Sequence, residues 1–111
     1  MITVDTLEIG IDQFAEAVNA GATIIDVREP SEYVDGHVPG AMLIPMGELP
    51  ARTAELEHGA PVYVVCASGN RSARMTGFLR SAGFDAYSVA GGTIGWARSG
   101  RPVAGGRAAG A

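Results

Sequence analysis

The chain has a single cysteine, Cys66, which stands where an apolar run ends and a loop of small residues begins. Residues 62–65 have no polar face, as is typical of a strand buried on both sides in a parallel sheet. Residues 67–70 favour a turn, and residues 71–82 predict a helix that Gly83 ends. A cysteine between a buried strand and the start of a helix is placed to react, whereas other free cysteines are often buried and inert.

The surroundings predicted for Cys66 favour the thiolate form, which is the nucleophile. A helix start leaves unpaired N–H groups and about half a positive charge, and Arg71 and Arg74 add two full charges beside it. A free cysteine, with a pKa of about 8.5, is mostly protonated at neutral pH. We therefore expect the pKa of Cys66 to be lowered.

Residues that bind metals are too few for a closed metal site. With one cysteine and two histidines, His37 and His58, the chain has no complete ligand set for structural zinc or an iron–sulfur cluster. None of the eight basic residues is a lysine, which excludes a lysine Schiff base and a P-loop lysine. We expect chemistry at Cys66 without a metal or an organic cofactor.

The length and composition fit one compact domain. The chain has 111 residues, of which 47% are hydrophobic, enough for one core and too little for two. We expect the domain at residues 1–103 and a flexible tail at residues 104–111. A net charge of −4 argues against a nucleic-acid partner, and no apolar run approaches the roughly 20 residues that cross a membrane. The single cysteine and the absence of a leader-like start predict a cytoplasmic protein.

Charge is unevenly distributed along the chain. Residues 1–60 hold eleven acidic residues and two arginines, whereas residues 61–111 hold one acidic residue and six arginines. The half that contains Cys66 is therefore locally positive, which favours an anionic substrate. The alternative is that the two halves interleave in the fold and the asymmetry averages out.

Strand and helix patterns alternate along the chain. Strands are predicted at residues 6–9, 23–27, 41–44, 62–65 and 86–89. Helices are predicted at residues 11–19, 28–35, 47–57 (with Leu49 and Leu56 inward) and 71–82, with a short one around Ile94 and Trp96. Such alternation is typical of an α/β domain, so we predict a five-stranded parallel sheet with helices on both faces. Ligands bind such sheets beyond the carboxyl ends of the strands, where Cys66 lies.

Four blocks of residues resemble a known family. They are the segment 26–29 with Glu32 and Tyr33, the segment 36–41, the loop 66–72, and the pair Gly91-Gly92 with Trp96. Each block is short, but together they resemble the single-domain rhodaneses, sulfurtransferases of the thiosulfate type, over residues 4–101. The resemblance implies a single rhodanese-like α/β domain.

The resemblance implies that Cys66 is the catalytic nucleophile. In this family the cysteine takes the outer sulfur of a donor such as thiosulfate, holds it as a persulfide and passes it to cyanide or a thiol. The implied donor is a small anion or a persulfide, and the acceptor thiol can belong to a partner protein. Backbone N–H groups would surround the sulfur, Gly69 would allow the tight curvature, and the hydroxyls of Ser68 and Ser72 would add donors. The implied substrate-binding residues are Ala67, Ser68, Gly69, Asn70, Arg71 and Ser72.

The loop differs from the commonest family pattern at Ala67, where many members have arginine. The missing cation argues against thiosulfate as the natural donor and leaves room for a less charged persulfide. Two other functions remain open: a sulfur-carrier or redox module that a partner protein loads, and phosphate-ester hydrolysis. Related phosphatases place five residues between the cysteine and an arginine, whereas four separate Cys66 from Arg71, and a shorter loop suits sulfur better than a phosphoryl group.

Other polar residues in these blocks are expected to have structural roles. Asp26 and Arg28 resemble the polar partners that hold the fold in this family. His37 is expected to be a hydrogen-bonded turn residue, because a thiolate that is already formed needs no general base. Trp96 is expected to pack in the core.

Overall fold

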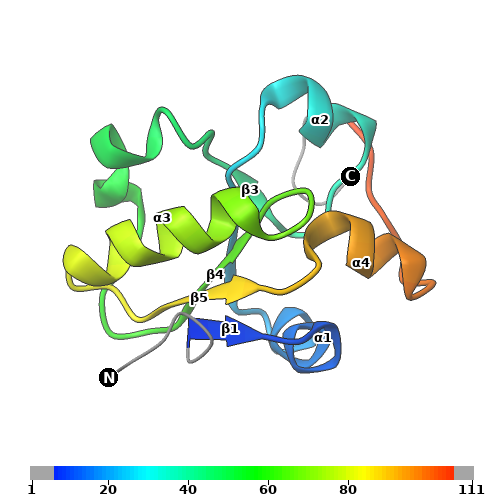
Figure 1. Ribbon diagram of the computed structural model, residues 1–111, viewed down its shortest axis with the longest axis horizontal. Helices are drawn as coiled ribbons and strands as arrows, with labels where there is room; N and C mark the ends of the chain where they lie inside the picture. The colour runs from blue at the N-terminus through cyan, green and yellow to red at the C-terminus, as the bar shows by residue number, and fades with distance from the viewer. Residues whose placement is uncertain (1–6, 107–111) are drawn as a thin grey trace.

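The computed structural model describes residues 7–106, which fold around one parallel sheet (Figure 1). Within these residues the five strands are β1 (Glu8–Ile9), β2 (Thr23–Asp26), β3 (Met42–Leu43), β4 (Val62–Val65) and β5 (Ala86–Val89). They lie in the order β1-β5-β4-β2-β3, and every neighbouring pair is parallel. The predicted five-stranded parallel sheet is confirmed, although the first strand begins at Glu8 and residue 6 lies outside the described residues.

The central strand, β4, carries Cys66 at its carboxyl end. It is hydrogen-bonded to β2 on one edge and to β5 on the other. Val62, Val64 and Cys66 belong to one buried apolar cluster, whereas Val65 belongs to the cluster on the opposite face. Because side chains alternate along a strand, both faces of β4 are buried, which explains why this run has no polar face.

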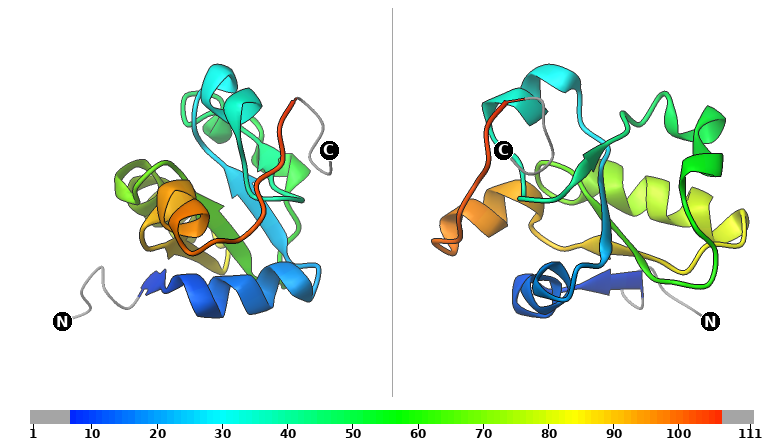
Figure 2. Two further views of the ribbon diagram at one scale, coloured as in Figure 1. Left: turned by 90° about the vertical axis from the view of Figure 1, so that its right-hand side faces the viewer. Right: turned by 180° about the vertical axis from the view of Figure 1, so that it is seen from behind.

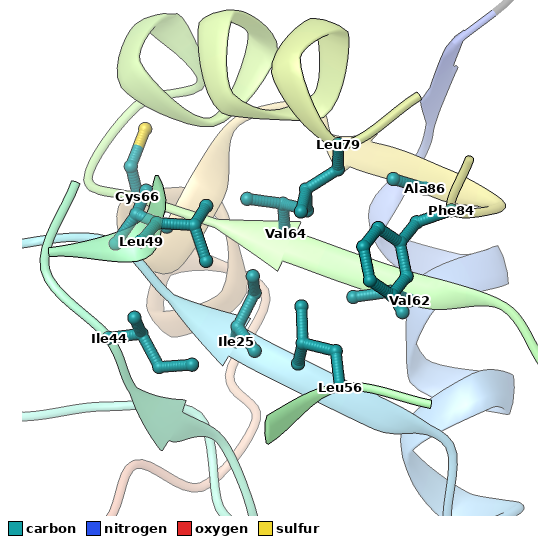
Figure 3. Close-up of a cluster of buried hydrophobic side chains, with 11 residues drawn as sticks. Ile25, Ile44, Leu49, Leu56, Val62, Val64, Cys66, Leu79, Phe84 and Ala86 are labelled. Carbon is teal, nitrogen blue, oxygen red and sulfur yellow. The ribbon is translucent and has the colours of Figure 1, made fainter. Parts of the chain in front are cut away.

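Helices cover both faces of the sheet, as predicted. The α-helices of the described residues are α1 (Ile11–Asn19), α2 (Pro30–Asp35), α3 (Asn70–Ser81) and α4 (Gly92–Arg98). α1 and α4 pack on one face, where the rings of Phe14 and Trp96 meet edge to face at 5.4 Å. α3 covers the opposite face and places Leu79 in the cluster that contains Val64 (Figure 3). None of these helices is long and apolar enough to cross a membrane.

The prediction of a helix at residues 47–57 is wrong. The segment instead forms two short 3₁₀ turns, Leu49–Ala51 and Thr53–Glu55. Pro50 explains the difference, because proline has no N–H to donate to the preceding turn and disfavours a helical conformation at the residue before it. The two leucines of this segment are both buried, so the inward direction predicted for them is confirmed.

The packed part of the chain continues past residue 103. Ala104, the first residue of the predicted tail, is buried and pairs with His37 through two backbone hydrogen bonds of 2.8 and 2.9 Å. The segment after α4 therefore runs back toward α2 and packs there (Figure 2). Residues 107–111 of the predicted tail lie outside the described residues.

Gly92, at the start of α4, leaves no room for a side chain. Its φ is +57°, and a Cβ there would lie 2.5 Å from the carbonyl oxygens of Cys66 and Ala67. We expect Gly92→Ala to lower the free energy of unfolding by about 3 kcal/mol, because a strained backbone and a clash with backbone atoms must both be relieved.

Gly77→Ala is the matched control for this substitution. Gly77 lies at an exposed position within α3, and a Cβ there meets nothing within 4 Å. Alanine favours a helix over glycine by roughly 0.5 to 1 kcal/mol, so this variant is expected to be stabilised. Urea unfolding measures both variants, and a Gly92→Ala protein as stable as the wild type contradicts the prediction.

Candidate active site

The loop after β4 curls around the sulfur of Cys66. This residue is 1% exposed, and its Sγ points from the sheet toward the start of α3 (Figure 3). Gly69 precedes α3 with a φ of +118°, a conformation that favours glycine, and its N–H donates a hydrogen bond of 3.1 Å to the sulfur. The tight turn at Gly69 therefore directs a backbone donor at the sulfur.

Ser72, in the first turn of α3, provides a second contact to the sulfur. Its hydroxyl oxygen is hydrogen-bonded to the Sγ of Cys66 at 3.4 Å, and the hydroxyl donates to the carbonyl of Gly69 at 3.1 Å. The hydroxyl oxygen of Ser88, in β5, lies 2.8 Å from that of Ser72. The side chains of Cys66, Ser72 and Ser88 are all buried, so these hydrogen bonds are shielded from water.

The pKa of Cys66 is lowered from its ordinary value, as the sequence predicts. Burial acts in the opposite direction, because it disfavours the charged form and raises the pKa. Hydrogen bonds from the hydroxyl of Ser72 and from the backbone N–H groups of Ser72, Gly69 and Ser68 outweigh burial. The charge of Arg71, one of the two arginines expected to act on the sulfur, also interacts with Cys66, as a minor cause of the raised pKa of Arg71. The thiolate is stabilised chiefly by hydrogen bonds of its own loop.

Arg71 is held by a carboxylate. Its two terminal nitrogens donate to the two carboxylate oxygens of Glu32, in α2, at 2.8 and 3.0 Å. This hydrogen bonding lowers the pKa of Glu32 to about 2. The same pair raises the pKa of Arg71, to which the negative charge of Cys66 makes a smaller contribution. Glu32 therefore belongs to the surroundings of the loop, a role that its place in a short sequence block did not indicate.

The start of α4 holds the other side of the loop. The N–H of Thr93 donates to the carbonyl of Cys66 at 2.8 Å, and the N–H of Ile94 donates to the carbonyl of Ala67 at 3.0 Å. The Gly91-Gly92 pair has a positive φ at both residues, which lets the turn before α4 approach the loop closely. The Gly91-Gly92 block therefore allows the start of α4 to hold the backbone of Cys66 and Ala67 in place.

Residues 11–99 match the family model described as the rhodanese-like domain. The matched segment includes β2 to β5 and the whole loop that surrounds the sulfur. The chain belongs to the rhodanese-like domain family. The resemblance read from the four sequence blocks is thereby confirmed.

Three similar proteins place this rhodanese-like domain among its relatives. A putative sulfur carrier protein of Bacillus subtilis, YrkF, is 37% identical over 79 residues, which are 69% of this chain and 43% of that protein. A sulfurtransferase of Allochromatium vinosum is 35% identical over 81 residues, which are 72% of this chain and 76% of that protein. The crystal structure of a rhodanese-related protein from Thermoplasma volcanium superposes with a TM-score of 0.82 at 35% identity, covering 87% of this chain and 96% of that one. The chain thus spans less than half of YrkF and most of the other two.

Asp26 and Arg28 form a buried ion pair in the rhodanese-like domain. The Nε and one terminal nitrogen of Arg28 donate to the carboxylate of Asp26 at 2.9 and 2.8 Å, and that nitrogen also reaches the carbonyl of Gly36 at 2.8 Å. Both charged residues are buried, so the pair ties the end of β2 to the end of α2, as expected for fold-holding partners. His37 is buried, stacks on Tyr33 and has its Nδ1 2.8 Å from the Tyr33 carbonyl, as expected for a hydrogen-bonded turn residue.

A shallow groove of about 410 Å³ lies beside the loop of the rhodanese-like domain. Ala67 contributes to its lining, together with Glu32 and Asp35 of α2 and Thr93 of α4. The Thr93 hydroxyl is buried and has no hydrogen-bond partner among the described residues. The groove beside residue 67, where many family members carry a cation, therefore has two carboxylates and one arginine, Arg28, in its lining.

The six predicted loop residues do not all turn their side chains to the sulfur. Ser68 is exposed and offers the sulfur its backbone N–H, with no side-chain hydrogen bond among the described residues. Asn70 is also exposed, at the first position of α3. Sequence reasoning missed Ser88, whose one signal is a hydroxyl in an otherwise apolar strand.

The ion pair between Glu32 and Arg71 predicts a dependence of stability on pH. Because the pKa of Glu32 is lowered from 4.5 to about 2, the pair stabilises the fold above the unfolded value and loses this effect as the pH falls toward 2. Both side chains are about one-third exposed, so solvent screening limits the contribution to about 1 kcal/mol. We expect Glu32→Gln to be less stable than the wild type at neutral pH and to lose less stability on acidification.

Glu57→Gln is the control for Glu32→Gln. It removes the same charge at an exposed residue that makes no hydrogen bond or ion pair within residues 7–106. Urea unfolding at neutral and acid pH compares the three proteins. Equal acid sensitivity of the wild type and Glu32→Gln would show that the pair does not contribute to stability.

Proposed function

We propose that this rhodanese-like domain is a sulfurtransferase that carries sulfane sulfur as a persulfide on Cys66. The observation that carries the proposal is the set of hydrogen-bonding groups around the sulfur. The N–H of Gly69 at 3.1 Å and the hydroxyl of Ser72 at 3.4 Å, with the lowered pKa of the thiol, favour a sulfur anion at this position. An anionic sulfur is needed both to attack the donor and to leave when the acceptor takes the sulfur.

In the loading step, the Cys66 thiolate attacks the outer sulfur of the donor. The bond between that sulfur and the rest of the donor breaks, and its electron pair leaves with the donor as a thiolate or, from thiosulfate, as sulfite. A new S–S bond joins the transferred sulfur to Cys66. The persulfide retains one negative charge, which the N–H groups at the start of α3 are suited to hold.

In the transfer step, cyanide or a thiolate attacks the terminal sulfur of the persulfide. The S–S bond to Cys66 breaks and its electrons return to the Sγ, which regenerates the thiolate. The product is thiocyanate or a new persulfide. Atoms and charge balance in both steps without a cofactor.

The charges around the loop favour a donor that is less negative than thiosulfate. Ala67 supplies no cation, Arg71 is already paired with Glu32, and Asp35 adds a further carboxylate to the groove. A dianion that enters this groove meets the carboxylate of Asp35, while the arginine of its lining, Arg28, is already paired with Asp26. A persulfide group on a small thiol or on a protein has one negative charge and therefore meets less repulsion.

A sulfur carrier that a partner protein loads is the second candidate. The Bacillus subtilis relative is named a putative sulfur carrier protein, which favours this function. The chemistry at Cys66 is the same, but turnover with small molecules is negligible. Phosphate-ester hydrolysis has less support, because Arg71 is engaged by Glu32 and does not stand free to bind a phosphoryl group.

Sulfur loading is the direct test of the proposed function. We expect the reduced protein, incubated with a small-molecule persulfide or with thiosulfate, to gain one sulfur atom in its intact mass. Added cyanide is expected to remove this atom and form thiocyanate, because the outer sulfur of a persulfide is electrophilic. Cys66→Ser is the control and does neither.

The outcomes separate the candidate functions. Loading that occurs only when a persulfidated protein is the donor supports the carrier. A wild-type protein that no persulfide donor loads rules out sulfur transfer through Cys66. Release of phosphate from an aryl phosphate, lost in Cys66→Ser, would support hydrolysis instead.

Donor charge is tested by restoring the cation at residue 67. We expect Ala67→Arg to lower the KM for thiosulfate by about three- to tenfold, because a guanidinium at the groove attracts the dianion. Ala60→Arg adds the same charge before the amino end of β4, far along the strand from Cys66, and is expected to leave the KM unchanged. Steady-state thiocyanate formation measures both, and an unchanged KM in Ala67→Arg contradicts the assignment of donor preference to this position.

A further inference from the structure

Three buried side chains form a continuous hydrogen-bonded row that begins at the reactive sulfur. The Sγ of Cys66 is 3.4 Å from the hydroxyl oxygen of Ser72, which is 2.8 Å from the hydroxyl oxygen of Ser88. Cys66 and Ser88 are each 1% exposed and Ser72 is fully buried. The row joins the ends of two neighbouring strands, β4 and β5, through the first turn of α3.

The partners of Ser72 determine which way each hydroxyl points. Its oxygen has one hydrogen to donate and two lone pairs to accept. The carbonyl of Gly69, at 3.1 Å, can only accept, so in the thiol state the Ser72 hydrogen goes there. The two lone pairs are then available to the Cys66 thiol and to the hydroxyl of Ser88. All three hydrogen bonds of the Ser72 hydroxyl form at once when the Ser88 hydroxyl donates its hydrogen to the Ser72 oxygen.

When Cys66 loses its proton, the sulfur changes from donor to acceptor. The Ser72 hydroxyl can then turn its hydrogen to the sulfur, while Ser88 continues to donate to the Ser72 oxygen. A hydroxyl that accepts a hydrogen bond becomes a stronger donor, because hydrogen bonds in a chain polarise one another. Ser88 thus strengthens the contact to the thiolate without touching the sulfur.

We propose that Ser88 is a positioning residue that holds the Ser72 hydroxyl against Cys66 and so favours the thiolate. The inference rests on the proposed function, in which Cys66 is the nucleophile. Ser88 is not a catalytic residue, because it reaches the sulfur only through Ser72. Its hydroxyl has no other hydrogen-bond partner among the described residues, so stability of the strand alone does not account for it.

The charged groups around the row stay the same when Ser88 is changed. On α3 the charged residues are Arg71, Arg74 and Arg80; the pKa of Arg71 is raised by Glu32 of α2 and to a smaller extent by Cys66 and Asp26. β5 itself, residues 86–89, carries no charged side chain, and the one charged residue of α4, Arg98, is at its far end. A change in the titration of Cys66 after substitution of Ser88 is therefore attributable to the hydroxyl.

The test is the pH profile of alkylation of Cys66 by iodoacetamide, which needs no sulfur donor and has no other cysteine to confuse it. We expect Ser88→Ala to move the midpoint to higher pH, with alkylation about threefold slower on the acid side of the profile. Ser88→Thr keeps the hydroxyl and is expected to keep the wild-type midpoint. Ser72→Ala moves the midpoint at least as far, and adding Ser88→Ala to it has no further effect, because the row is already broken.

Thr76→Val is the matched control. Thr76 is a hydroxyl on the same helix as Ser72, fully buried but without a hydrogen-bond partner among residues 7–106, so its removal is expected to leave the profile unchanged. A wild-type profile in Ser88→Ala overturns the proposal. So does an equal shift in Thr76→Val or Ser88→Thr, or an undiminished effect of Ser88→Ala in the Ser72→Ala background. If the alkylation shifts are as expected but sulfur loading fails, the proposed function is rejected, and only the effect of Ser88 on the ionisation of Cys66 is retained.

Discussion

A sulfur that carries negative charge at a buried position needs hydrogen-bond donors, and the rest of this structure supplies them. Burial alone raises the pKa of Cys66, so the hydrogen bonds of the loop must stabilise the thiolate by more than the loss of water destabilises it. The N–H of Gly69 and the hydroxyl of Ser72 do so only because the chain turns sharply at a glycine and then enters α3. The parallel sheet serves this arrangement by bringing the carboxyl ends of β4 and β5 side by side.

Fixed dipoles, and not net positive charge, dominate the surroundings of the sulfur. The two arginines near the site, Arg28 and Arg71, are each paired with a carboxylate. Arg71 comes from the positive half of the chain and its partner Glu32 from the acidic half. Arg101 and Asp12 pair across the same division at 3.1 Å. The charge asymmetry of the sequence is thus reduced by interleaving in the fold, the alternative left open by composition.

The sequence was informative where structure follows from local chemistry. The apolar run before Cys66 and the glycine after it predicted a buried strand, a tight turn and a helix start, because each depends on near neighbours. Pro50 disfavours an α-helix, and the segment expected to be helical around it forms two 3₁₀ turns. The partner of Arg71 could not be predicted, because it lies on a different element.

Buried hydroxyls mark the limit of reading from sequence. Ser88 in β5 and Thr76 in α3 look alike in the sequence, because each is a small hydroxyl residue whose side chain is buried. Packing gives Ser88 a partner and leaves Thr76 without one among the described residues. The difference arises from the distance between two elements, which no periodicity encodes.

The hydrogen bonds from Thr93 and Ile94 to the loop carbonyls make the surroundings of the sulfur depend on a later part of the chain. A chain that has emerged only as far as α3 already contains Cys66, but the backbone on which it sits is not yet anchored. The anchor comes from the start of α4, which follows β5 in the chain. An incompletely folded molecule therefore presents an ordinary thiol, less prone to alkylation and oxidation than a thiolate. The surroundings that lower the pKa of Cys66 are therefore complete only in the finished domain.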